Sequence, residues 1–451
     1  MNNIFIVVLG IYMLIFLAIG IRDIKSVKGI GDYAVAGKRQ GSVTVTMTLL
    51  ATALGASTTI GIADTIYSIG FPGIWWLAFG AVGLVLQSVF LSERVRETGA
   101  DTLPQLAEIT VGRAAGWLLA LVIVISWIGV IAGQFAAINS IITFATGGGD
   151  DRLFMIVAAI AIIYTVVGGQ ISVVKTDKIQ LIMIIAALTA GFIYLYFVKG
   201  GNTAQVMGNI ELCNDNYRPI NLFTQFFVIG GVYFLGPDII SRNFLSGNEK
   251  AAKRSALAAG LALFGFSIII TFIGMWVRYN VTADQLGDSK ALMYVINILP
   301  PYIGILLALG LLSAVLSSAD TCLVNASSIF VKDILKKDSV AATRVTAAVI
   351  GVIAALLAIG GRGDIMALLT GAYSIYTPGV IFPLTVAIFA YGRFDIKKPL
   401  WLAAVVLGGI VGAAGSYLTD IIPAAIQPYT VLIGMGISLV LSLLSVTGGM
   451  K

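Results

Sequence analysis

The sequence predicts an all-α integral membrane protein with about thirteen transmembrane helices. Hydrophobic residues make up 58% of its 451 positions and charged residues only 11%, whereas soluble domains carry about 25% charged residues. Apolar stretches of about 20 residues, long enough to cross a bilayer, recur along the whole chain. Glycine is abundant, with 51 residues, as is typical of helices that pack closely in lipid. The surface of such a chain is compatible only with a lipid bilayer.

The apolar stretches define the expected spans in order. The first, from Ile4 to Ile21, has no basic region before it and no small-residue cleavage site after it, so we interpret it as a retained helix. An odd number of spans places the two termini on opposite faces. The spans are expected near 3–21, 43–69, 72–92, 115–145, 152–168, 176–199, 221–241, 255–277, 302–331, 343–360, 365–391, 399–419 and 427–447.

Basic residues orient this array in the cell (inner or plasma) membrane. With the N-terminus outside and the C-terminus in the cytoplasm, most of the 28 Lys and Arg, including Arg242, fall in inner loops. This positive-inside bias explains the net charge of +6 without a nucleic acid partner. No buried arginine is expected that could clamp a carboxylate of a solute, which disfavours a pocket built on such a clamp. The outer loops keep Arg152, Lys199, Arg218, Arg278, Lys290 and Arg362.

Several classes of function are disfavoured by what the sequence lacks. It contains no histidine, which removes histidine metal ligands, bases and proton relays. It also lacks a GxxxxGK[ST] element, so ATP-driven pumping by this chain alone is not expected. We expect that the chain is not an enzyme and that it has no obligate protein partner. Residues 1–451 are expected to form a single transmembrane domain.

The second span contains a run of small and hydroxylated residues that weakens the helix. Gly55 and Gly61 favour a break, and the hydroxyls between them can satisfy the freed backbone groups. A break would release the carbonyls of Ala51 and Leu54 toward an ion or a ligand. The alternative is a small-residue face for tight helix packing. The hydroxylated residues are Ser57, Thr58 and Thr59.

A second interruption, Gly236-Pro237-Asp238, lies in the seventh span. Paired interruptions five spans apart are the expected mark of a transporter built from two inverted five-helix repeats with broken first helices. The repeats would cover 43–199 and 221–391, with one N-terminal and two C-terminal helices outside them.

The ninth span carries candidate cation ligands. Ala314, Ser317 and Ser318 are spaced i, i+3, i+4 and share one helix face. Two hydroxyls and a carbonyl form half of an oxygen cage for Na⁺, which the carbonyls of Ala51 and Leu54 could complete. Serine hydroxyls in a span can instead bond back to their own helix.

Two carboxylates in or near the spans suggest a possible second Na⁺ site. A carboxylate within a span is functional by default because its burial costs a few kcal/mol. Asp320 lies one turn beyond Ser317, and Asp177 begins the sixth span, where a helix cap is the alternative role. The two carboxylates and Thr321 could hold a second cation nearer the cytoplasm.

These stretches together resemble the sodium:solute symporter family. The resemblance rests on three segments in register over about 300 residues: Ala51 to Gly61, Tyr164 to Gln180 with its Gly-Gly, Thr-Asp and Gln elements, and Ala314 to Thr321. Ser172 and Lys175 depart from the usual pattern, where an alanine and often an aromatic residue stand.

The resemblance implies a leucine-transporter-like fold and secondary active symport of a small organic solute with Na⁺ by alternating access. It also implies a Na⁺ site of five oxygens and a second site in some members, and it leaves the solute open. A channel or sensor on the same scaffold is the alternative. The five oxygens would be Ala51 O, Leu54 O, Ala314 O, Ser317 Oγ and Ser318 Oγ.

Candidate solute-binding residues lie on the broken spans and their neighbours. An aromatic side chain among them could equally be packing or an interfacial anchor. If Asp238 faces the pocket, it favours a cationic or hydroxyl-rich solute. The candidates are Ser57, Thr58, Trp76, Gln134, Tyr233, Asp238, Tyr373 and Tyr376.

Overall fold

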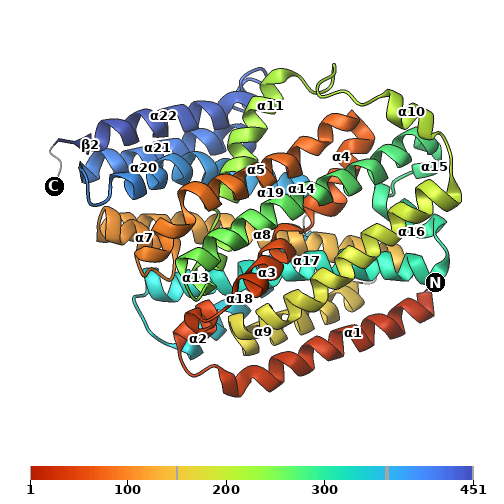
Figure 1. Ribbon diagram of the computed structural model, residues 1–451, viewed down its shortest axis with the longest axis horizontal. Coiled ribbons are helices and arrows are strands. Elements are labelled where there is room, and N and C mark those ends of the chain that lie inside the picture. The colour runs from red at the N-terminus through yellow and green to blue at the C-terminus, as the bar shows by residue number, and fades with distance from the viewer. Residues whose placement is uncertain (1, 149–150, 361–364, 449–451) are drawn as a thin grey trace.

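The computed structural model describes residues 2–148, 151–360 and 365–448, and nearly all of them are helical (Figure 1). Within these residues, eleven helices are long and apolar enough to cross a membrane, or twelve with one bent pair. Ten of the eleven are built on α1 (Asn2–Asp23), α5 (Trp75–Phe90), α8 (Arg113–Thr146), α9 (Asp151–Ile193), α14 (Glu249–Asn280), α17 (Pro301–Ile329), α18 (Val340–Gly360), α19 (Ile365–Tyr376) followed by α20 (Phe382–Ala390), α21 (Lys398–Tyr417) and α22 (Thr430–Ser445). The eleventh is Pro219–Leu245.

Both predicted interruptions are present. The bent pair consists of two segments that meet at an angle of 62°. The first is α3 (Ser42–Ala53), and the second is a π-helical turn (Ser57–Gly61) that continues into α4 (Ile62–Ile69). The seventh predicted span consists of α11 (Pro219–Gln225), α12 (Gly231–Leu235) and α13 (Pro237–Leu245). Between α12 and α13, Gly236 leaves the helical region with a ψ of 143°.

The predicted count of thirteen spans is not confirmed. The spans expected near 152–168 and 176–199 are joined in α9, which has 43 residues, and the π-helical turn after it (Tyr194–Lys199). A straight helix of that length would be about 65 Å long, about twice the hydrocarbon thickness of a bilayer. The chain departs from helical geometry at Gly169, with φ 55° and ψ −155°. Glycine adopts such dihedrals without the clash that a Cβ would cause.

Short helices connect the spans at the two ends of the molecule. Figure 1 places α2, α7 and α13 toward one end and α10, α15 and α16 toward the other. These elements are α2 (Ile30–Val35), α6 (Ser92–Glu97), α7 (Leu103–Thr110), α10 (Thr203–Gly208), α15 (Ala283–Leu286) and α16 (Ala291–Ile298). Strand β1 (Asp395–Ile396) pairs antiparallel with β2 (Val446–Thr447), so the fold is not purely helical.

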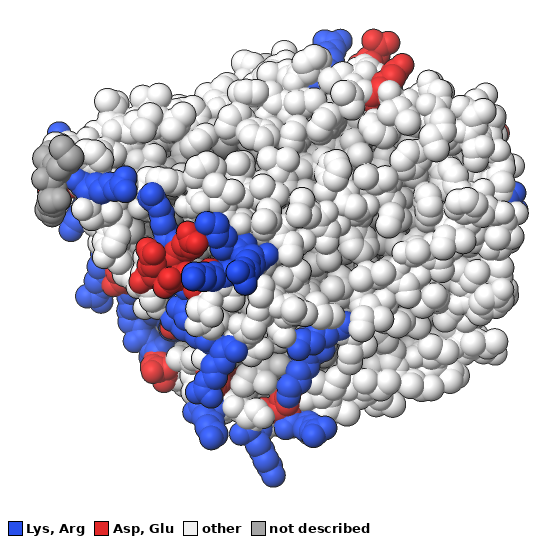
Figure 2. Space-filling view, in the orientation of Figure 1, with Lys and Arg blue, Asp and Glu red and all other residues white. Residues whose placement is uncertain are grey.

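Charge and burial follow the pattern of a membrane protein. Large apolar side chains are exposed on the outer helices, such as Val7 on α1 and Leu261 on α14, where lipid would cover them. Figure 2 shows lysines and arginines gathered toward the α2/α7 end, with a broad uncharged surface beside them. By contrast, α17 lies in the interior, and every residue from Leu307 to Ile329 on it is buried.

Candidate functional site

The break after α3 redirects backbone amides away from the helix. In a continuous helix the amides of Gly55 and Ala56 would donate to the carbonyls of Ala51 and Thr52. The Gly55 amide donates instead to Thr58 Oγ1 at 2.6 Å, and the Ala56 amide donates to Gln134 Oε1 at 2.9 Å. The carbonyls of Ala51 and Thr52 are therefore free of their usual helical donors.

Helix α17 lies directly against this break. The Ser318 hydroxyl donates to the Thr52 carbonyl at 2.8 Å. A Cβ at position 55 would lie 2.6 Å from Ser318 Oγ, so this approach requires glycine at Gly55. The predicted Na⁺ ligands from both helices are all buried: Ala51, Leu54, Ala314, Ser317 and Ser318.

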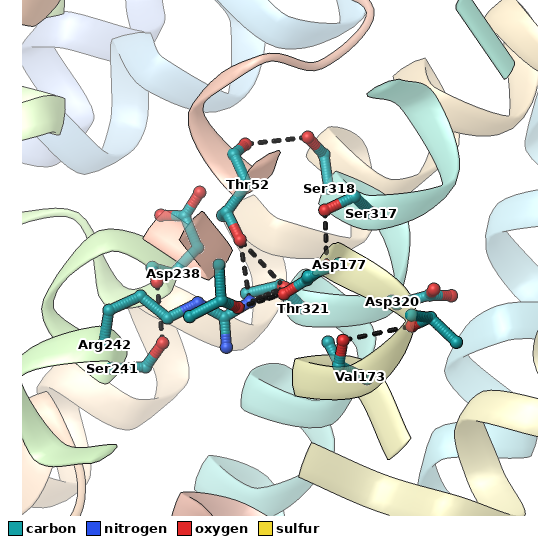
Figure 3. Close-up of polar contacts among 12 residues, drawn as sticks. Thr52, Val173, Asp177, Asp238, Ser241, Arg242, Ser317, Ser318, Asp320 and Thr321 are labelled. Atoms are coloured by element: carbon teal, nitrogen blue, oxygen red, sulfur yellow. Dashed lines mark hydrogen bonds and ion pairs between the residues drawn. The ribbon is translucent and has the colours of Figure 1, made fainter. Parts of the chain in front are cut away.

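An ion pair adjoins these residues in the interior (Figure 3). Arg242 Nη2 lies 3.2 Å from Asp177 Oδ2, and neither side chain is exposed. The same nitrogen donates to Thr52 Oγ1 at 2.7 Å and to Thr321 Oγ1. Asp177 also accepts from Thr48 and, at 2.6 Å, from Ser317. Arg242 lies on α13 and is fully buried, so the expectation that it lies in an inner loop and that no arginine is buried is wrong.

The three residues expected to form a second Na⁺ site do not converge. Asp177 and Thr321 meet through Arg242, as described above. Asp320 turns to other partners, because Tyr164 donates to its Oδ2 at 2.5 Å and Thr165 to its Oδ1 at 2.6 Å. Figure 3 shows Arg242 and Asp320 on opposite sides of Asp177. A guanidinium nitrogen thus stands among the oxygens of Asp177, Thr321 and Thr52.

The second break is capped by side chains from other helices. Tyr376 on α19 donates its hydroxyl to the Leu235 carbonyl at the end of α12, and Gln87 on α5 donates to the Phe234 carbonyl at 3.2 Å. Tyr376 is fully buried and stacks edge-on against Trp127. Its place in the structure is therefore that of a cap, not of a residue lining the central cavity.

A cavity of about 20 Å³ lies between the two breaks. Five of the eight candidate solute-binding residues line it: Ser57, Gln134, Tyr233, Asp238 and Tyr373. Three do not. Thr58 is engaged with the backbone of the first break, Tyr376 caps α12, and Trp76 lines a different hollow. The remaining lining residues are Thr52, Ala53, Gly55, Val130, Val232, Ile239, Ser318 and Cys322.

Trp76 belongs to a larger hollow of about 560 Å³. This hollow also touches Tyr217, Arg218 and Asn221 at the start of α11. It reaches Ser374 on α19, the neighbour of Tyr373 in the central cavity. The hollow and the central cavity are therefore lined by consecutive residues of α19.

At the α2/α7 end of the molecule, ion pairs connect segments that are distant in the sequence. Asp101 lies 2.6 Å from Lys38 and 2.5 Å from Lys332 at the end of α17. Burial raises the pKa of Asp101, but hydrogen bonds and charges from Lys332 and Lys38 outweigh it and lower this pKa below its ordinary value. Nearby, Thr102 donates to Asp333 at 2.7 Å. These contacts tie the segment before α3 to α17.

A family comparison covers most of this architecture. The sodium:solute symporter family model matches residues 33–401, which include both breaks, the Ser317-Ser318 face and the Asp177–Arg242 pair. The chain belongs to the sodium:solute symporter family. It is accordingly a membrane transporter that couples the movement of a solute to Na⁺ by secondary active transport.

Individual relatives of this symporter differ in the solutes they are named for. A sodium/glucose cotransporter of Vibrio parahaemolyticus is 25% identical over 91% of this chain and 83% of its own. A sodium/pantothenate symporter of Haemophilus influenzae is 25% identical, covering 69% and 68%. A solved Na⁺-coupled sialic acid symporter, in a substrate-bound outward-open state, matches 99% of both chains with a TM-score of 0.80 at 19% identity. That likeness shows the leucine-transporter-like fold.

Arg242 is the main feature of the site that sequence reasoning missed. Its basic side chain, eight residues before the basic segment that begins at Lys250, favoured an inner loop. The local signal against that reading was the apolar run of Ile239 and Ile240 just before it, which continues α13 into the interior.

Proposed function

We propose that this symporter binds Na⁺ between the break after α3 and the face of α17. The ligands are Ala51 O, Leu54 O, Ala314 O, Ser317 Oγ and Ser318 Oγ. The observation that carries the proposal is the contact of Ser318 with the opened turn of α3. Oxygen ligands of this kind suit a hard monovalent cation.

The hydrogen bonds of the two serines support this assignment. A hydroxyl has one hydrogen to donate and two lone pairs to offer. Ser317 gives its hydrogen to Asp177 and Ser318 gives its hydrogen to Thr52. The lone pairs of both oxygens therefore remain for a cation. Na⁺ at this place would join α3 to α17 and stabilise one conformational state.

We propose that each cycle uses a single Na⁺. The residues first considered for a second site, Asp177 and Thr321, surround the guanidinium of Arg242. This fixed positive charge takes the place that a second cation would fill, and Asp320 is held elsewhere by Tyr164 and Thr165.

The solute is proposed to bind in the central cavity beside the Na⁺ site. The hollow near α11 is its entrance from outside, and the ion pairs of Asp101 close the cytoplasmic exit. We further propose that the N-terminus is outside and the C-terminus in the cytoplasm of a cell membrane, and the gathering of basic residues at the α2/α7 end supports this orientation. Repeats over 43–199 and 221–391 would move against each other to alternate access. Na⁺ and solute are coupled because both favour the same state, and the effect is reciprocal.

The test is Na⁺-dependent thermal stabilisation of the purified full chain. We expect Na⁺, but not K⁺, to raise the melting temperature of the wild type. The double variant Ser317→Ala/Ser318→Ala should lose this response. Ser327→Ala is the matched control, because Ser327 is buried on the same helix and its hydroxyl donates to carbonyls of that helix. An unchanged Na⁺ response in the double variant would refute the proposed site.

A further inference from the structure

Asp238 is an acidic residue whose Oδ1 has no hydrogen-bond partner among the described residues. It follows Gly236 and Pro237 at the start of α13. Its Oδ1 is buried and has no hydrogen-bond partner among the described residues, and no ion pair of the described chain includes it. Burying a carboxylate without compensation is costly in a membrane interior. A carboxylate that is retained despite this cost and lines a cavity indicates a ligand that binds there from outside the protein.

The nearest arginine does not provide that partner. Arg242 stands one turn along the same helix, but its Nη2 bonds to Asp177, Thr52 and Thr321. Its Nε and Nη1 have no hydrogen-bond partner among the described residues, so neither of them bonds to Asp238. Figure 3 shows the Asp238 carboxylate directed away from the guanidinium, while its backbone carbonyl accepts from Ser241. Among the described residues that line the central cavity, Asp238 is the only one with a charge.

The rest of the cavity also suits a cation. Two tyrosine rings, Tyr233 and Tyr373, line it together with Asp238, and aromatic faces attract ammonium groups. The Tyr233 hydroxyl is turned to the Ala53 carbonyl at 2.9 Å, which fixes this ring at the cavity wall. A free space of about 20 Å³ holds one water-sized group, which is the size of a primary ammonium head.

We propose that the solute carries a primary or secondary ammonium group, and that this group binds Asp238 in the central cavity. The inference rests on the proposed function, because it takes this cavity as the solute site. The ammonium forms a charge-assisted hydrogen bond with Oδ1, and the rest of the solute extends along Tyr373 and Ser374 toward the larger hollow. A solute whose only charge is a carboxylate is disfavoured, because its charge would lie beside Asp238.

The test measures melting temperatures of the purified full chain in Na⁺ with matched pairs of small metabolites. In each pair a hydroxyl replaces the ammonium group: glucosamine with glucose, 1,4-diaminobutane with 1,4-butanediol, and alanine with lactate.

An acidified cell extract is also divided on a strong cation-exchange resin, which retains amines and passes sugars and carboxylic acids. The variants are Asp238→Asn, the conservative Asp238→Glu, and Asp284→Asn, which removes one exposed carboxylate of α15.

We expect stabilisation by the resin-retained fraction and by an amine, but not by its hydroxyl analogue. Asp238→Asn should weaken the affinity at least about tenfold, Asp238→Glu should keep part of it, and Asp284→Asn should keep all of it. Stabilisation by the unretained fraction, or equal affinity in wild type and Asp238→Asn, would overturn the proposal. If an amine binds through Asp238 without any dependence on Na⁺, the proposed Na⁺ coupling site fails while this inference stands.

Discussion

Two acidic residues in the interior of this symporter have opposite surroundings. Asp177 is enclosed by Arg242, Ser317 and Thr48, so its charge is balanced within the protein. Asp238 faces the central cavity, and its buried Oδ1 lacks a partner among the described residues. This difference indicates that the two carboxylates have different roles. The Asp177 cluster holds α3, α9, α13 and α17 together, whereas Asp238 is kept for a ligand.

The largest expected effect comes from breaking the balanced cluster. Arg242→Gln leaves Asp177 as a buried charge without its counterion and should destabilise the fold by about 3–5 kcal/mol. Asp238→Asn removes a charge that forms no ion pair within the described residues, so the fold should lose little or no stability. The measurement is the melting temperature of both variants in detergent without solute.

A double variant controls for this contrast. Arg242→Gln/Asp177→Asn removes both charges and should recover part of the stability lost in Arg242→Gln alone. If Arg242→Gln and Asp238→Asn lowered the melting temperature equally, the distinction between a balanced and an open carboxylate would be contradicted.

Sequence patterns predicted the parts of this site that depend on local chemistry. Gly55 and the Gly236-Pro237 pair indicated both breaks, and the spacing of Ser317 and Ser318 placed them on one face of α17. Both are properties of neighbouring residues in the chain, so no tertiary information is required.

The rest depends on contacts between distant segments. The pairing of Arg242 with Asp177 joins residues 65 positions apart, and the turn of Asp320 toward Tyr164 joins residues 156 apart. Tyr376 could be read as a pocket residue until the fold placed its hydroxyl on the Leu235 carbonyl. The span count differs because the two expected spans follow each other directly across the kink at Gly169 and count together as one long helix.

A smaller effect is expected at the cytoplasmic end, where charges are partly solvated. Asp101→Asn removes the ion pairs with Lys38 and Lys332 and should cost about 1 kcal/mol at neutral pH. Because the folded-state pKa of Asp101 is lowered, this stabilisation is present above the unfolded pKa and is lost as pH falls through the lower folded value. The difference in melting temperature between wild type and variant should therefore shrink below about pH 4.

Glu93→Gln is the matched control, because Glu93 forms a single, more exposed pair with Lys253. Its effect should be smaller than that of Asp101→Asn. A loss of stability in Asp101→Asn that stayed constant down to pH 3 would argue against a role for the charge of Asp101.

The central claim is a single Na⁺ held by the broken α3 and the serines of α17, with Arg242 in place of a second ion. Equilibrium binding of ²²Na⁺ to the purified full chain tests it without knowledge of the solute. The account predicts one Na⁺ per polypeptide in the wild type and in Ser327→Ala, and none in Ser317→Ala/Ser318→Ala at the same concentration. Two Na⁺ per wild-type polypeptide, or undiminished binding in the double variant, would contradict it.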